Sequence, residues 1–230
     1  MNIERTLFWF SDGNNNLLSL NKEYFGLGYL LNRLLNENYE GKKIKFINIY
    51  FRTEETYKLY PQASKNIAHF HGGVLTYDDV FDLYSFNKMT KKDQNSFIWE
   101  RAFEILREAS ISIKNEDLLR SSEYAYKKGI KIDLNIDYRM VENDIDLFND
   151  TLKASVWVNF KDESMYSKFT LEKENKIIFE KLLDASNTGN EFFLEMYKNI
   201  EFDSHNIIIK GHKDVEYLPL KIPISEIMVD

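Results

Sequence analysis

The sequence predicts an α+β protein, with an N-terminal α/β part containing two packed helices, followed by an antiparallel β-meander. Two observations predict this class. Strand-like and helix-like patterns are mixed through the first 130 residues, whereas the last third consists of short apolar segments separated by turn residues. The chain has 230 residues, of which 43% are hydrophobic and 15% aromatic, so it can build a substantial core.

The first segments predict strands around a helix. Residues 6–11 are apolar and end at an Asp-Gly turn signal, after which residues 17–20 are expected to return as a short strand. Leucines repeat at helical spacing through 22–37, which predicts an amphipathic helix. Residues 43–51 are apolar on both faces, as is typical of a strand in the middle of a sheet.

Two helices are expected to follow each other directly. A short helix is expected from Asp78 to Tyr84, and the strongest helical pattern then covers about 91–112. Thr90 begins a capping box for this helix, and Asn115 is the N-cap of the next one. Gly129 ends the second helix, because glycine adopts the left-handed conformation found after helix C-termini.

The last third of the chain predicts an antiparallel meander. Short apolar segments separated by turn residues are expected to form its strands, at 152–160, 166–172, 176–183, 206–210 and 215–224. We therefore divide the chain into an α/β part at 1–130, an acidic connecting segment at 131–150 and a β part at 151–230. The alternative is that the α/β and β parts form one single domain.

Negative charge is concentrated in the connecting segment. Residues 1–130 hold 18 Lys/Arg and 17 Asp/Glu, residues 131–150 hold two basic and six acidic residues, and residues 151–230 hold 10 and 14. The net charge is −7. A local acidic surface attracts basic partners and repels phosphate backbones.

The acidic residues therefore predict a surface that binds a basic protein. A second carboxylate group repeats every four residues on the strongest helix, opposite its apolar face. Tyr138 is expected to be exposed as an anchor, as are Tyr124 and Tyr126, since tyrosine is enriched at interface hot spots. The predicted acidic contacts are Asp133, Asp137, Glu142, Asp144, Asp146, Glu100, Glu104 and Glu108. The alternative interpretation of both acidic groups is an ordinary solvated surface.

Composition and motifs argue against several other classes. The chain has no cysteine, which excludes disulfides and thiolate chemistry. The sequence pI is about 5.3, whereas domains that grip phosphates are usually strongly basic, so we expect no nucleic-acid partner. Neither glycine-rich nucleotide-binding motif occurs. We expect no membrane association, since no apolar run is long enough to span a bilayer, and a cytoplasmic location.

His69 and His71 are the weak candidates for a metal site. In an extended chain both imidazoles lie on one side, so both can reach one ion. A zinc or iron site needs a third ligand, and the remaining candidates are Asp78, Asp79, His205 and His212. The alternative interpretation is two ordinary strand-end histidines before a turn.

The interpretation we favour is a non-enzymatic acidic inhibitor that needs no cofactor. In general character the chain is similar to a bacterial toxin-immunity protein that neutralises a basic partner such as a nuclease toxin, although no motif carries this similarity. Abundant Lys, Asn and Ile are typical of an AT-rich bacterial or phage genome. The alternative is a metal-dependent hydrolase that uses His69 and His71 with acidic residues.

Overall fold

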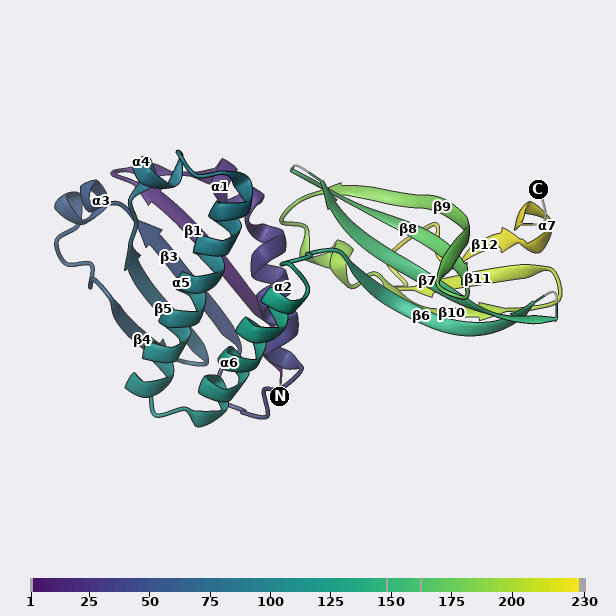
Figure 1. Cartoon of the computed structure of the whole chain (residues 1–230), viewed down its shortest axis with the longest axis horizontal. Helices are drawn as coiled ribbons and strands as arrows, with labels where there is room; N and C mark the ends of the chain where they lie inside the picture. Colours follow the sequence, from purple (N-terminus) through teal and green to yellow (C-terminus); the bar gives the residue numbers. More distant parts are fainter. Residues whose placement is uncertain (1, 148, 162, 228–230) are drawn as a thin grey trace. The chain divides into compact units, whose positions relative to one another are not determined.

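The computed structural model describes residues 2–147, 149–161 and 163–227, which form two compact units. We call Met1–Ile136 the N-terminal unit and Asp137–Asp230 the C-terminal unit. Helices occur together with antiparallel strands, so the predicted α+β class is confirmed (Figure 1). The division falls inside the segment 131–150, but residues 138–147 of that segment form a strand and do not merely connect the units.

The N-terminal unit is built on a five-stranded sheet. Its strands are β1 (Arg5–Asp12), β2 (Asn15–Asn16), β3 (Phe46–Arg52), β4 (Ile67–His71) and β5 (Val74–Val80). They lie in the order β2-β1-β3-β5-β4. The central strands β1, β3 and β5 run parallel, and the two edge strands are antiparallel to their neighbours. The expectation that the 43–51 segment is a central strand is correct.

Three helices cover one face of this sheet. The helices of the unit are α1 (Leu18–Glu23), α2 (Phe25–Asn36), α3 (Glu54–Leu59), α4 (Leu83–Phe86), α5 (Lys91–Ser112) and α6 (Glu116–Lys131). Of these, α2, α5 and α6 pack together against the sheet (Figure 1). The predicted caps are both present, since the side chains of Thr90 and Asn115 accept hydrogen bonds from Asp93 N and Leu118 N.

The core between the helices and the sheet is rich in aromatic rings. Phe10 is fully buried, and its ring centroid lies 5.0 Å from that of Phe51 and 5.5 Å from that of Phe81. Trp99 of α5 packs so closely on Gly129 of α6 that a Cβ at this glycine would lie 2.2 Å from the indole. Gly129 is therefore a helix-packing residue inside α6, and the helix continues to Lys131 beyond the end predicted from sequence.

Two local predictions in the N-terminal unit are wrong. The return strand expected at 17–20 belongs mostly to α1, and only the two-residue β2 pairs with β1. Asp78 and Asp79 do not begin a helix but end strand β5. Their carboxylates point to opposite faces of the sheet, where Arg52 pairs with Asp78 and Arg101 with Asp79. Long-range ion pairs therefore override the local preference of aspartate for helix starts.

The C-terminal unit is dominated by antiparallel strands. A four-stranded sheet has the order of a meander, with β6 (Tyr138–Leu147), β7 (Asp150–Lys161), β8 (Ser164–Lys173) and β9 (Lys176–Asn187). A 3₁₀ turn, η1 (Glu191–Leu194), leads to a three-stranded sheet of β10 (Tyr197–Phe202), β11 (Asn206–Gly211) and β12 (Leu220–Pro223), followed by α7 (Ile224–Ile227). The predicted meander is confirmed, and the last strand is shorter than the expected 215–224.

Candidate functional site

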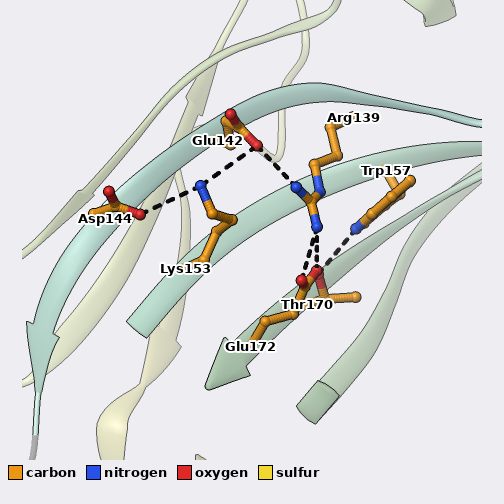
Figure 2. Close-up of polar contacts among 7 residues, drawn as sticks. All are labelled: Arg139, Glu142, Asp144, Lys153, Trp157, Thr170 and Glu172. Carbon is orange, nitrogen blue, oxygen red and sulfur yellow. Dashed lines mark hydrogen bonds and ion pairs between the residues drawn. The ribbon is translucent and has the colours of Figure 1, made fainter. Parts of the chain in front are cut away.

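The outer face of the meander carries interacting charged and polar side chains from three strands (Figure 2). The inner face of the same strands is apolar and fully buried, as at Ile145, Val156 and Phe169. Strand register places Asp144 opposite Lys153 and Lys153 opposite Glu172. Because neighbouring strands lie about 4.8 Å apart, such opposed side chains contact one another across the sheet.

Arg139 and Glu172 form the buried centre of this group. The Arg139 Nη2 donates to both carboxylate oxygens of Glu172, at 3.0 and 2.7 Å, and the Glu172 side chain is only 7% exposed. The guanidinium lies 4.7 Å from the ring centroid of Trp157. The Trp157 indole donates to the Thr170 hydroxyl at 3.1 Å, and this hydroxyl donates to Glu172 at 3.4 Å. A buried carboxylate loses its hydration, and here the charge of Arg139 and these hydrogen bonds compensate the Glu172 carboxylate for that loss.

The more exposed carboxylates of this group, Glu142 and Asp144, form longer ion pairs. Glu142 accepts from Arg139 Nη1 at 3.2 Å and lies 3.9 Å from Lys153 Nζ, which in turn lies 3.5 Å from Asp144. The side chains of Glu142 and Asp144 remain 49% and 64% exposed. Exposed ion pairs contribute about 0–1 kcal/mol each to stability. A partner protein can therefore replace them with ion pairs of its own at little cost in free energy. We call Glu142, Asp144 and Asp146 the β6 acidic row.

Net charge divides sharply between the units. The N-terminal unit holds 19 Lys/Arg and 18 Asp/Glu, a net charge of +1. The C-terminal unit holds 11 Lys/Arg and 19 Asp/Glu, a net charge of −8. The acidity of the chain therefore belongs to the β unit, and the β6 acidic row is one part of it.

The predicted contact residues are split between the two units. Asp133 lies in the N-terminal unit, whereas Asp137, Tyr138 and the β6 acidic row lie in the C-terminal unit. Asp137 accepts hydrogen bonds from Asn159 Nδ2 at 2.7 Å and from Phe160 N at 2.9 Å, so it fastens β6 to β7. Its carboxylate has a structural role that charge counting along the sequence does not reveal.

Tyr138 is not the exposed anchor that the sequence predicts. Its side chain is buried, and its hydroxyl donates to the carbonyl of Leu194 at 3.1 Å. The strand alternation places it on the inner face of β6. In the N-terminal unit, Tyr126 stacks on Phe103 with centroids 4.4 Å apart, and the Tyr124 hydroxyl donates to Glu37.

The predicted carboxylate ridge on α5 has three different environments. Glu104 pairs with Arg101, and Glu108 accepts from the Tyr77 hydroxyl at 2.5 Å. Burial, together with this hydrogen bond to a carboxylate, raises the pKa of Tyr77. Glu100 lines a hollow of about 500 Å³ beside α5 and α6 that Asp133 also lines. The ridge is therefore partly committed to contacts within the unit.

The four histidines are divided between the two units, two in each. His69 and His71 are exposed on β4 in the N-terminal unit, whereas His205 and His212 belong to the C-terminal unit. His205 contacts Ser204, and His212 lies 3.3 Å from Asp214. In the described part of the chain, no group of three or more His, Asp or Glu side chains is placed to hold a metal ion.

Sequence reasoning missed a hollow at the carboxyl ends of the parallel strands, the edge where open α/β sheets usually bind ligands. Its volume is about 610 Å³, and its lining includes Asp12, Thr53 and Asp82. The Asp12 carboxylate accepts from the Thr53 hydroxyl at 2.7 Å, and Asp82 accepts from Ser85 N and Oγ. These hydrogen bonds lower the pKa of Asp82. Only the parallel pairing brings these residues together.

Sequence reasoning also missed Arg139, Lys153, Trp157 and Glu172 as members of the outer-face group. Comparisons with protein-family models, with curated proteins and with solved structures find no match. Among the described residues, no helix combines the length and apolar character needed to cross a membrane. The arrangement of charges is therefore the basis for a functional conclusion.

Proposed function

We propose that this chain is a non-enzymatic binding protein whose C-terminal unit associates with a basic protein. A toxin-immunity protein or an inhibitor of a nucleic-acid enzyme fits this description, because such enzymes carry basic surfaces where they hold phosphates. A cytoplasmic site of action is part of the proposal.

The observation that carries the proposal is the charge of the C-terminal unit. Its net charge of −8 is held by 94 residues, beside an N-terminal unit of +1. Complementary charge steers two proteins together and raises their association rate, by factors of about 10 to 1,000 at low ionic strength. A compact unit with this excess is suited to rapid capture of a cationic surface.

The β6 acidic row is the surface we assign to the first contact. Its three carboxylates repeat every second residue along one strand, so they lie about 6.8 Å apart on one face. Their exposure leaves them open to lysine or arginine side chains of a partner. Arg139 and Glu172 beneath them hold the strands in register. We expect this ion pair to stay intact when a partner binds.

Capture of the partner at low and at high salt tests the proposal. Immobilised protein is incubated with native bacterial lysate, and bound proteins are identified by mass spectrometry. We expect stoichiometric capture of one basic protein that is lost at high salt, since screening weakens exposed charge pairs. Capture of no basic protein contradicts the proposal.

A matched pair of variants then locates the contact. Asp144→Lys with Asp146→Lys reverses two charges of the β6 acidic row, and Glu195→Lys with Glu216→Lys reverses two exposed charges elsewhere in the same unit. We expect the first pair to slow association with the captured partner by about tenfold or more at low salt, and the second pair much less. Equal effects of both pairs contradict the assignment to the row.

A further inference from the structure

The face of the N-terminal sheet opposite α2, α5 and α6 forms a second surface. Strand register places Arg5 beside Phe46 and Trp9 beside Tyr50 on this face. It continues onto β5 and β4, where Thr76 lies opposite His69. We call this surface the open face, and its side chains include Arg5, Leu7, Trp9, Phe46, Asn48, Tyr50, Arg52, Thr76, His69 and His71.

Exposure separates the two faces of the same strands. The side chains that alternate with the open face point to the helices and are fully buried, as at Phe8, Phe51 and Leu75. On the open face, Trp9 and Tyr50 are only partly buried, and both histidines are exposed. Large aromatic residues that keep part of their surface in solvent at neighbouring positions mark an interaction site.

The aromatic rings of Trp9 and Tyr50 on the open face form a platform of two stacked rings. The rings of Trp9 and Tyr50 are inclined by only 18°, with centroids 6.3 Å apart. The Trp9 indole donates to Asn48 Oδ1 at 3.1 Å, so its polar atom is satisfied within the sheet. Arginine guanidinium groups lie 5.4 Å from the Phe46 centroid and 4.7 Å from the Tyr50 centroid. The platform therefore combines π surfaces with positive charge.

The rim of the open face is also basic. Lys42, Lys43 and Lys45 immediately precede β3, and Arg5 N contacts the Lys45 carbonyl at this end of the sheet. On the face itself the one carboxylate in the register rows is Asp78, which is buried and pairs with Arg52 at 2.5 Å. Glu4 adds one exposed acid beside Arg5. Positive charge exceeds negative charge here, although the whole chain is acidic.

We propose that the open face binds single-stranded nucleic acid. Bases stack on the rings of Trp9, Tyr50 and Phe46, and the phosphates contact the arginines and the lysine-rich rim. Sheets that present aromatic rings on an uncovered face bind two or three unpaired bases by stacking. Stacking needs bases whose faces are free, which a duplex does not offer. Single-stranded nucleic acid offers both phosphates for the basic groups and free base faces for the aromatic rings, whereas an acidic surface on a second copy of the chain would match only the charge.

This inference does not rest on the proposed function and reverses one expectation from the sequence. The low pI argues against a nucleic-acid partner only when the whole chain is averaged. The acidity belongs to the C-terminal unit, whereas the open face lies on the unit with a net charge of +1. Two units of opposite net charge can hold partners of different kinds.

Fluorescence anisotropy with the full-length chain tests the proposal. The probes are labelled oligothymidylate and oligouridylate of about 12 nucleotides, within the site size of such platforms, and a duplex of the same length. We expect the single strands to bind, the duplex to bind more weakly, and affinity to fall as salt rises. Failure of the wild-type chain to bind either single strand overturns the proposal.

Matched variants assign the binding to the open face. We expect Tyr50→Ala to weaken binding of the single strands by about fivefold or more. Tyr84→Ala removes the same side chain from a site that is 72% exposed on α4, and it is expected to leave binding unchanged. Equal losses in both variants overturn the assignment. Circular dichroism confirms that each variant is folded.

Photo-crosslinking of the wild-type chain avoids the risk that a variant fails to fold. We expect crosslinked peptides from β1 and β3, and crosslinks confined to the C-terminal unit overturn the proposal. Analytical sedimentation tests whether a second copy of the chain covers the open face instead. If the chain forms a dimer that Tyr50→Ala disrupts and binds no oligonucleotide, the open face is an interface between copies and the proposal is wrong.

Discussion

The two units of this chain hold nearly equal numbers of acidic residues, 18 and 19, but different numbers of basic ones, 19 and 11. The N-terminal unit packs helices on one face of a mostly parallel sheet, and the C-terminal unit is built from antiparallel strands. Because the second unit is shorter, with 94 residues against 136, the difference in net charge comes mainly from its higher density of Asp and Glu. The two units therefore present surfaces of different net charge.

The buried carboxylates of the two units also have different surroundings. In the N-terminal unit Asp79 is 1% exposed and pairs with Arg101 at the end of the core. In the C-terminal unit Glu172 is buried on the outer face, and the exposed Glu142 shares its arginine. The first pair stabilises the packing of a helix on a sheet, and the second supports a charged surface.

Core truncations give the largest effects and test whether the units are independent. Phe10→Ala and Phe169→Ala each remove a fully buried ring, one in each unit, and each should lower the free energy of unfolding of its own unit by about 3–5 kcal/mol. Differential scanning calorimetry should show two transitions, with each variant shifting one of them. A single transition that both variants shift equally would show that the units unfold together.

The outer-face network should show a smaller, graded effect. Arg139→Met leaves the buried Glu172 without its cation, so the C-terminal unit should lose about 1–3 kcal/mol of stability. Lys153→Met removes a cation from exposed pairs only and should cost less than about 1 kcal/mol. Urea unfolding of both variants measures the difference. Equal costs would mean that burial does not distinguish the two ion pairs.

Helix capping should affect the N-terminal unit alone. Asn115→Ala removes the hydrogen bond to Leu118 N and should cost about 1 kcal/mol. Glu116→Gln changes the next residue without touching that bond and should cost only a few tenths. The transition of the C-terminal unit serves as the internal reference in the same calorimetric scan. Movement of that reference with Asn115→Ala would contradict independence of the units.

The smallest expected effect is a pH dependence of opposite sign in the two units. Burial raises the pKa of Asp79, even against the pairing with Arg101. Stability linked to this group is therefore fully present below the unfolded pKa of about 3.9 and is lost as the pH rises through the folded value. Relative to Asp79→Asn, the wild-type N-terminal unit should become less stable as the pH rises above about 3.9.

Asp203 provides the comparison in the C-terminal unit. Hydrogen bonds from the backbone N–H groups of His205 and Asn206 lower its pKa. Its stabilising contribution is therefore present above the unfolded value and is lost as the pH falls through the folded value. Urea unfolding of Asp203→Asn across the same pH range should show the opposite trend to Asp79→Asn. The same trend in both variants would contradict these assignments.

Local patterns made much of the fold predictable. Thr90 and Asn115 cap the two long helices as their sequences indicate, because capping involves residues only three positions apart. Residues 17–20 resemble a strand in sequence but lie mostly in helix α1, since a short apolar segment fits a strand and a helix equally well. Asp78 and Asp79 were misplaced because their ion-pair partners are 26 and 22 residues away.

The candidate surfaces were less predictable than the fold. The sequence predicts the acids of the β6 acidic row as contact residues. It does not predict that Tyr138 is buried, because the strand that contains Tyr138 resembles a connecting segment in sequence. Trp9 and Tyr50 are 41 residues apart in the chain, and only the parallel register places their rings side by side. No local signal marks the open face.

The sequence by itself determined the long helices α2, α5 and α6, the strands β1, β3, β7, β8 and β9, the absence of cysteine chemistry and the total charge. These properties follow from residue type and from spacing over a few positions. Only the tertiary structure decided which carboxylates are neutralised and which sheet face the helices leave uncovered. The physical reason is that ion pairs, strand register and burial join residues distant in the chain, and their energies depend on that placement.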